Sequence, residues 1–260
     1  MTKEVQSPSQ PLSKPRWKTI GILGGMGPEA TVDLFARIVR LVPAQRDQDH
    51  PRIIIDSNSR IPDRTAAIKG EGESPRPALI ETAANLERAG AELIAMPCNS
   101  AHFWYAEIAA AVHIPVLNMV RLTAEAARRK LAGSAPHGPV LILATTGTIS
   151  SGLYQRAFDE IGLRTVVPPA DAQDKVMEAI YLVKGGKAGQ ARPLALEVLA
   201  ELSRTLKLSA VVLGCTELPL ILSQGDTEIP LIDSTEVLAR ATVEQARCGQ
   251  PTLPAEAVRQ

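Results

Sequence analysis

The sequence predicts an α/β protein of two similar lobes, each with a parallel sheet flanked by helices. Near-continuous apolar runs alternate with segments of helical spacing, a pattern typical of parallel strands that are covered on both faces. The pattern that begins near residue 20 also restarts near residue 140. A chain of 260 residues suits one large domain or two lobes of ~100–150 residues, and the restart favours two lobes.

The first half alternates strand and helix in order. We expect strands over 17–25, 51–59, 92–97 and 114–119, and helices over 28–42, 74–91, 100–112 and 121–132. Pro28 fits its helix because proline is tolerated in a first turn. The second half has the apolar runs VLIL and SAVVLG, and Pro219 favours a helix that starts just after Glu217.

Two segments of the first half recur in the second half. IGILGGMGP aligns with VLILATTGT at an offset of 120 residues, which places Gly27 over Gly147. ELIAMPCNSA aligns with SAVVLGCTEL at an offset of 117 residues, which places Cys98 over Cys215. Each half is therefore a strand, a glycine-containing turn and a helix, followed later by a strand and a cysteine. We expect a pseudo-two-fold axis between the lobes.

The repeat also sets the expected boundaries. We assign a disordered tail to 1–17, the first lobe to 18–120 and the second lobe to 121–233, and expect a C-terminal helix over about 234–248 to pack back on the first lobe. The tail is polar, contains several prolines and lacks the apolar core of a signal peptide.

Composition excludes several function classes. Lys plus Arg and Asp plus Glu both total 28, and only 3% of residues are aromatic, so we expect no nucleic-acid partner. No apolar run approaches the ~18 residues of a membrane span. Three cysteines are too few for a disulfide framework, which favours a reducing cytoplasm and free thiols.

Two of these cysteines, Cys98 and Cys215, are placed to do chemistry. Each ends an apolar strand before an expected helix, at the edge of a parallel sheet where ligands bind. A helix N-terminus favours the thiolate. Either cysteine alone would more often be a buried apolar residue, but a matched pair across a cleft suits removal of a proton from one face of a carbon and delivery to the other. Cys248 lies outside both repeats, and we expect no catalytic role for it.

Moving a proton from one face of a carbon to the other is the chemistry of racemisation and epimerisation. Racemisation of an amino acid also needs hydrogen-bond donors around its carboxylate, which stabilise the developing carbanion. Arg64 is a candidate carboxylate clamp, although an isolated arginine is usually a solvated surface charge. The expected donors are Ser57, Asn58, Asp63, Arg64, Thr65, Asn99, Ser100, Thr145, Thr146, Thr148 and Thr216.

Five motifs carry a family resemblance. GILGGMGPEATVDLFARIV, IPDRTAAI, MPCNSAH, ATTGTISSGLY and GCTELPLIL resemble the aspartate racemases of the cofactor-independent aspartate/glutamate racemase family, from about Lys18 to about Glu244. The resemblance implies two lobes, no pyridoxal phosphate, no metal and the catalytic pair Cys98 and Cys215. It implies substrate contacts at Asp63, Arg64, Thr65, Asn99, Ser100 and Ala101. We expect a homodimer.

The sequence departs from the family pattern at one charged position. A family lysine precedes the segment VMEAIY by a fixed spacing, and Asp174 stands there with Lys175 one residue later. Lys175 substitutes for that lysine if it reaches the pocket; otherwise Asp174 repels a distal carboxylate. Ser100 replaces the commoner threonine and keeps the hydroxyl.

Other readings stay open. GMGPEA fits a dinucleotide-binding turn, but the next acidic strand end, Asp56, lies too far along and Pro28 interrupts the turn. Cys98 and His102 have the spacing of a thiol–imidazole pair.

Four alternative functions remain. They are a racemase for glutamate or a broader amino-acid set, a decarboxylase, a maleate isomerase and a non-catalytic small-acid binding protein. Glu217 orients either the Cys215 thiol or the substrate ammonium, or its charge only stabilises the start of the following helix.

Overall fold

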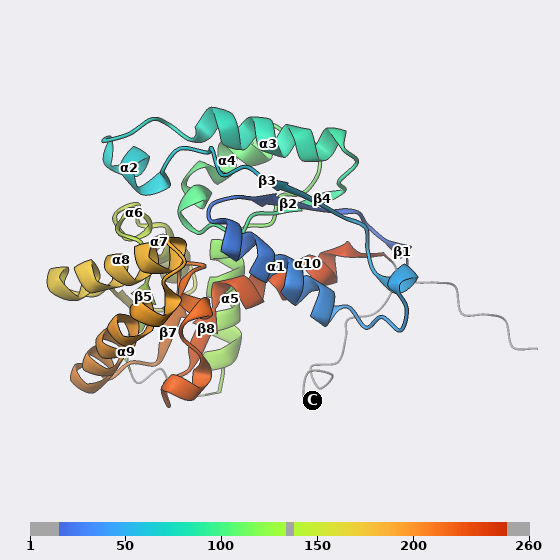
Figure 1. Ribbon diagram of the computed structural model, residues 1–260. Helices are drawn as coiled ribbons and strands as arrows, with labels where there is room; N and C mark the ends of the chain where they lie inside the picture. The colour runs from blue at the N-terminus through green and yellow to red at the C-terminus, as the bar shows by residue number, and fades with distance from the viewer. Residues whose placement is uncertain (1–15, 134–137, 249–260) are drawn as a thin grey trace, which may run out of the picture.

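The molecule contains two parallel sheets (Figure 1). The computed structural model describes residues 16–133 and 138–248. The first sheet has the order β3-β2-β4, with β2 at Ile20–Gly24, β3 at Ile53–Ser57 and β4 at Leu93–Ala95. The second has the order β6-β5-β7-β8, with β5 at Val140–Leu143, β6 at Thr165–Val166, β7 at Ala210–Leu213 and β8 at Leu231–Asp233. The predicted α/β class with parallel sheets is confirmed.

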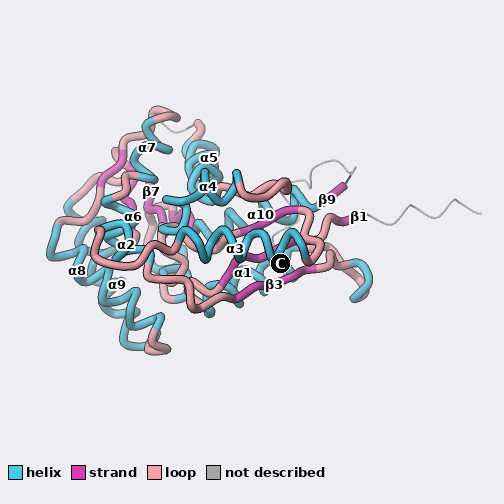
Figure 2. Tube along the Cα trace, turned by 90° about the horizontal axis from the view of Figure 1, so that it is seen from above, coloured by secondary structure: helices cyan, strands magenta, loops and turns pink. Residues whose placement is uncertain are grey.

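Helices cover both faces of each sheet. Their bounds are α1 Pro28–Leu41, α2 Arg64–Lys69, α3 Arg76–Arg88, α4 Tyr105–Ala110, α5 Met119–Leu131, α6 Thr146–Ser150, α7 Leu153–Asp159, α8 Ala170–Lys184, α9 Ala188–Thr205 and α10 Ser234–Ala246. Figure 2 shows α8 and α9 at one end of the molecule and, at the other, the small ribbon of β1 (Arg16–Trp17) and β9 (Arg247–Cys248).

The central strands of the two sheets share a register. In the first sheet Ile20 of β2 pairs with Leu93 of β4, and in the second Val140 of β5 pairs with Ala210 of β7. These are the residues that the two sequence offsets place over one another. Matching strand ends, and the cysteines that follow them, therefore occupy corresponding places in the two lobes.

Two helices are exchanged between the lobes. Helix α5 follows the last segment of the first lobe, yet its buried Val120, Ala124 and Ala127 pack with β5, β7, β8 and α7 of the second lobe. Of its buried apolar side chains, only Met119 at its start packs with the first lobe. Helix α10 follows β8, yet it packs with β2, β4 and α1 of the first lobe (Figure 1). The caps correspond as well: the side chain of Asn118 accepts from the backbone N–H of Arg121, and that of Asp233 from Thr235 and Glu236.

Three expected elements differ in the structure. The expected strand over 114–119 is reduced to one bridge between Ile94 and Val116, because Pro115 has no N–H to donate and α5 begins at Met119. The expected helix over 100–112 is divided into a 3₁₀ turn, Ser100–Trp104, and α4. The helix expected after Glu217 is only the 3₁₀ turn Leu218–Leu220.

The N-terminal tail also differs from its expected extent. Arg16 and Trp17 form β1, which pairs antiparallel with β9, Arg247–Cys248. Residues 1–15, which make up the rest of that tail, lie outside the described residues. Within 16–133 and 138–248, no helix has the length and apolar character needed to span a membrane.

Candidate active site

A cavity lies at the carboxyl ends of four strands, two from each lobe. Met26 follows β2, Cys98 follows β4, Thr145 follows β5 and Cys215 follows β7. Its lining consists of Met26, Asp63, Arg64, Thr65, Cys98, Asn99, Ser100, Thr145, Thr148, Ile180, Tyr181, Lys184, Gly214, Cys215, Thr216 and Glu217. Such an edge is where open parallel sheets bind ligands.

Most of the expected site residues line this cavity. They are Cys98, Cys215, Asp63, Arg64, Thr65, Asn99, Ser100 and Thr216. Thr145 and Thr148 line it as well, whereas Ser57, Asn58, Ala101, Thr146 and Lys175 do not. The amide of Asn58 donates to the Thr82 hydroxyl at 3.1 Å, Ala101 is buried in the apolar core beneath the cavity, and Thr146 is replaced in the lining by its neighbours Thr145 and Thr148.

The expected role of Lys175 is corrected by the structure. Its Nζ lies 2.8 Å from Oε1 of Glu197 on α9, and it does not line the cavity. Lys184, nine residues later on the same helix, does. At 3.6 residues per turn, nine residues amount to two and a half turns, so the two lysines point from opposite faces of α8. Asp174 does not line the cavity either.

Cys98 has neutral neighbours. Its Sγ lies 3.6 Å from the hydroxyl Oγ of Ser100, two residues along the chain. His102 holds the backbone here: Nδ1 lies 2.8 Å from the carbonyl oxygen of Cys98, and Nε2 accepts from the N–H of Met119 at 3.0 Å. An accepting Nε2 requires the proton on Nδ1. Burial also lowers the pKa of His102. Because both ring nitrogens are engaged by backbone groups, neither is free to take a proton from the Cys98 thiol.

Cys215 has charged neighbours. Its thiol donates to Oε2 of Glu217 at 2.9 Å, and Oε1 of that carboxylate lies 2.5 Å from Nζ of Lys184. Burial and the Glu217 carboxylate raise the pKa of Cys215 well above its usual range, and Lys184 offsets this only in part. The expectation that a helix N-terminus makes this residue a thiolate is therefore wrong for Cys215.

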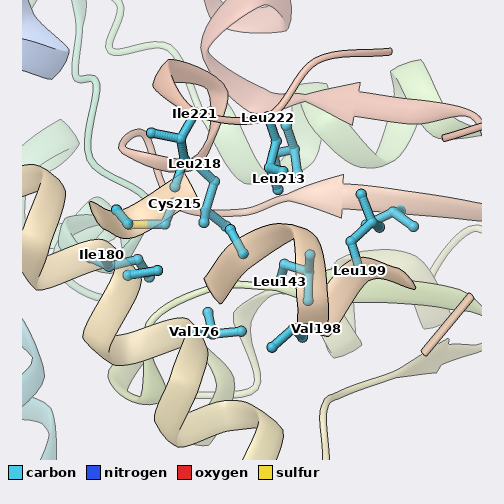
Figure 3. Close-up of a cluster of buried hydrophobic side chains, with 14 of the residues drawn as sticks. Leu143, Val176, Ile180, Val198, Leu199, Leu213, Cys215, Leu218, Ile221 and Leu222 are labelled. Carbon is cyan, nitrogen blue, oxygen red and sulfur yellow. The ribbon is translucent and has the colours of Figure 1, made fainter. Parts of the chain in front are cut away.

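The charged groups around Cys215 lie at the edge of an apolar cluster. Figure 3 shows the side chain of Cys215 at the end of an apolar cluster, with Ile180 and Leu218 beside it. Burial opposes the ammonium of Lys184, yet the Glu217 carboxylate raises its pKa above the ordinary value. Glu217 is only 2% exposed, so it is stabilised by these two partners and by the Thr216 hydroxyl, which donates to it at 3.2 Å.

Arg64 lies on the first-lobe side of the cavity. One guanidinium nitrogen donates to the carbonyl oxygens of Ile61 at 3.1 Å and Pro62 at 2.9 Å. Its Nε is buried and has no hydrogen-bond partner among the described residues, so it is a donor available to an anion in the cavity. A Cβ on Gly147 would lie 2.8 Å from the Cα of Thr65, so the glycine lets α2 and α6 approach closely.

Several lining residues were not expected from the sequence. They are Met26, Ile180, Tyr181, Lys184 and Gly214. The available signal was the spacing of Ile180, Tyr181 and Lys184, which share one face of α8 at i, i+1 and i+4. Among the described residues, no group of three or more His, Cys, Asp or Glu is arranged to hold a metal ion.

The arrangement supplies two thiols, one from each lobe, in one cavity. A hydroxyl accompanies the first thiol and a carboxylate–ammonium pair the second. Thiols in different protonation states can exchange a proton with opposite faces of one bound carbon. Arg64 and Lys184 supply cationic groups for carboxylates.

Comparison with known proteins agrees with this geometry. Residues 23–242 match the family model described as Asp/Glu/Hydantoin racemase. The chain is 31% identical over 232 residues to the broad specificity amino-acid racemase RacX of Bacillus subtilis, covering 86% of this chain and 96% of that protein. A glutamate racemase of Corynebacterium kroppenstedtii is 29% identical over 175 residues, covering 64% of this chain and 58% of the relative.

Solved structures resemble the whole two-lobed fold. The aspartate racemase of Picrophilus torridus has a TM-score of 0.79 and 37% identity, covering 88% of this chain and 94% of that one. An aspartate racemase homologue from Pyrococcus horikoshii OT3 has a TM-score of 0.69 and 28% identity, covering 88% of this chain and 99% of that one. The chain therefore belongs to the Asp/Glu/hydantoin racemase family, and it is an isomerase of the racemase type.

Proposed function

We propose that this racemase interconverts L- and D-aspartate without a cofactor, using Cys98 and Cys215 as its two acid–base groups. The observation that carries the proposal is the single cavity that both thiols line, together with Arg64 and Lys184. Two cationic side chains suit a substrate with two carboxylates.

The chemistry follows from the different settings of the two thiols. One cysteine, as the thiolate, takes the α-proton from one face, and the other, as the thiol, delivers a proton to the opposite face. Glu217 keeps Cys215 protonated, so Cys215 is the acid in the resting form and Cys98 the base. For the opposite enantiomer the roles reverse.

The developing carbanion requires stabilisation because an α-proton next to a carboxylate is very weakly acidic. Hydrogen-bond donors aimed at the α-carboxylate lower the energy of this species. The hydroxyls of Thr145 and Thr148 and the amide of Asn99 line the cavity and are the donors that we assign to this task. The Nε of Arg64 and the ammonium of Lys184 are left for the distal carboxylate.

A broader substrate range is the second candidate. It is favoured by the likeness to a relative named as a broad specificity amino-acid racemase. In the cavity Lys184 is already paired with Glu217, which weakens the net attraction for a distal carboxylate and gives this candidate a physical basis.

The test is incubation of the purified protein with single enantiomers of aspartate, glutamate and several neutral amino acids, followed by chiral chromatography. We expect inversion of aspartate to be fastest, and to survive chelator and hydroxylamine treatment. Parallel reactions in deuterium oxide report the α-proton exchange. A protein that binds these acids but neither inverts nor exchanges them would be a binding protein, and restoration by an added metal or cofactor would overturn the cofactor-free mechanism.

A further inference from the structure

A buried chain of hydrogen bonds connects the two cysteine-bearing segments. It begins at Asn99, directly after Cys98, whose amide Nδ2 donates to the hydroxyl of Ser234 at 3.2 Å. That hydroxyl donates to the carbonyl oxygen of Leu213 at 2.7 Å, and Leu213 lies two residues before Cys215. Three side-chain and backbone groups thus span from one thiol segment to the other.

Tyr154 joins the same chain from α7. Its hydroxyl donates to Oδ1 of Asn99 at 2.5 Å. Its ring also lies against the second segment, because a Cβ added to Gly214 would lie 3.0 Å from Cε2 of Tyr154. The tyrosine therefore contacts the residue that follows Cys98 and the residue that precedes Cys215.

Every group in this chain has a definite role as donor or acceptor. The Ser234 hydroxyl has a single proton, which goes to Leu213, so it must accept from Asn99. The orientation of the Asn99 amide is then fixed, since its Oδ1 accepts from Tyr154. Burial raises the pKa of Tyr154, so its hydroxyl stays protonated and remains a donor. The Tyr154 and Ser234 hydroxyl protons and Oδ1 of Asn99 are each paired within the network, and buried networks of this kind are rigid.

We infer that the Tyr154–Asn99–Ser234 network sets the separation and aim of the two catalytic thiols, so that Tyr154 and Ser234 are positioning residues for inversion. The inference rests on the proposed two-thiol mechanism. Removal of a proton needs only one thiol in place, whereas inversion needs both at fixed distances from one carbon. Misplacement by about 1 Å can cost roughly 100-fold in rate. A network that ties both segments together acts on inversion more than on proton removal.

This role is more than core packing. Asn99 comes from the first lobe and Tyr154 from the second, while Ser234 opens the exchanged helix α10. All three are buried, with Asn99 at 3% and the other two at 0% exposure. A substitution that removes only a hydroxyl leaves the apolar contacts of the site in place.

The test compares Tyr154→Phe and Ser234→Ala with the wild-type protein in deuterium oxide, starting from one enantiomer of aspartate. We expect the inversion rate to fall about 10- to 100-fold, with KM changed far less. Deuterium appearing in recovered, uninverted substrate should rise relative to deuterium in the inverted product. The reason is that a carbanion facing a misplaced thiol is reprotonated from its original face. The double variant should be little worse than the poorer single variant, because both act through Asn99.

Thr242→Val is the matched control. Its hydroxyl is also buried in α10 and donates to a backbone carbonyl, that of Leu238, at 2.7 Å, but it does not line the cavity. It should lower the unfolding midpoint without changing the ratio of exchange to inversion. If Tyr154→Phe fails to fold, Ser234→Ala still decides the matter, since it keeps the tyrosine. An unchanged ratio in the folded variants would overturn the inference, whereas a wild-type protein that neither inverts nor exchanges would overturn the proposed function.

Discussion

The two cysteine segments have the same backbone setting and different chemical surroundings. Both thiols follow a strand of matching register, yet the residue two places after Cys98 is Ser100 and the residue two places after Cys215 is Glu217. A hydroxyl is neutral, whereas a carboxylate opposes a thiolate. Duplication of a fold thus places a matched pair of residues, and the neighbouring side chains then give the two thiols different electrostatic surroundings.

The largest expected effect comes from removing either thiol. General acid–base groups contribute about 10²–10⁴-fold, so Cys98→Ala and Cys215→Ala should each lower racemisation by roughly that factor or more. Cys→Ser variants at the same positions should retain α-proton exchange from one face. Chiral chromatography and deuterium incorporation measure the two reactions. Full activity of either alanine variant would show that the pair does not act together.

The next effect concerns the cation beside the second thiol. Lys184→Ala should reduce kcat/KM for aspartate by about 10- to 150-fold, the equivalent of roughly 1.5–3 kcal/mol for a charged hydrogen bond. Neutral amino acids should lose far less. Lys175→Ala is the control, because that lysine lies on the outer face of α8 with Glu197. Equal losses for acidic and neutral substrates would place Lys184 in a structural role.

A smaller effect, on the pH profile, distinguishes Glu217 from Ser100, the residues two places after each cysteine. The Glu217 carboxylate raises the pKa of Cys215, so Glu217→Gln should lower that pKa, and the unpaired Lys184 should lower it further. Where Cys215 is the acid, activity is lost as pH rises through its pKa, so the high-pH limb should move to lower pH.

Ser100→Ala is the comparison for this variant, since it removes a hydroxyl and no charge. Its high-pH limb should stay close to that of the wild type. The pH profile of kcat/KM for each enantiomer, together with the ultraviolet absorbance of the thiolate, measures both variants. Coincident limbs in Glu217→Gln and wild type would contradict the assignment of Cys215 as the acid of the resting form.

The smallest expected effect is on the pH dependence of folding stability, and it comes from His102 next to the Cys98 backbone. Burial lowers the pKa of His102 in the folded state below its unfolded value of about 6.5. Below pH ~6.5 the unfolded chain therefore binds a proton that the folded chain does not, and stability falls with decreasing pH, by at most about 1.4 kcal/mol per unit.

His102→Gln should flatten this slope, and the exposed His113→Gln should not. Denaturant unfolding at several pH values between about 5.5 and 7.5, one unit on either side of the usual histidine pKa, provides the comparison. A wild-type slope in His102→Gln would mean that other groups cause the pH dependence.

The sequence predicted the backbone of the site better than its side chains. Cys98, Cys215 and Arg64 were found because strand ends and register follow from apolar runs and a repeat. Lys184 was missed because the choice between two lysines on one helix depends on which face of α8 meets the cavity, and the family spacing suggested Lys175. The effect of the helix start on Cys215 was overestimated, because a 3₁₀ turn of three residues has little dipole and Glu217 lies within hydrogen-bond reach.

Thr146 and Thr145 illustrate the limit at the level of single residues. The motif indicated that a hydroxyl after β5 reaches the cavity, but the first turn of α6 turns Thr146 away and leaves Thr145 and Thr148 in the lining. A shift of one residue at a helix start rotates a side chain by about 100°. The motif therefore predicted all three threonines as donors, and the helix phase keeps Thr145 and Thr148 in the lining and excludes Thr146.

The exchange of α5 and α10 has a consequence for how the chain reaches its native state. The first lobe cannot cover the α1 side of β2 until α10, the last helix of the described chain, has left the ribosome. Contacts between residues that far apart in sequence slow folding and leave apolar surface open during synthesis. A fragment ending after α5 would expose Ile20, Ile22 and Leu34 and would be expected to aggregate or to recruit a chaperone.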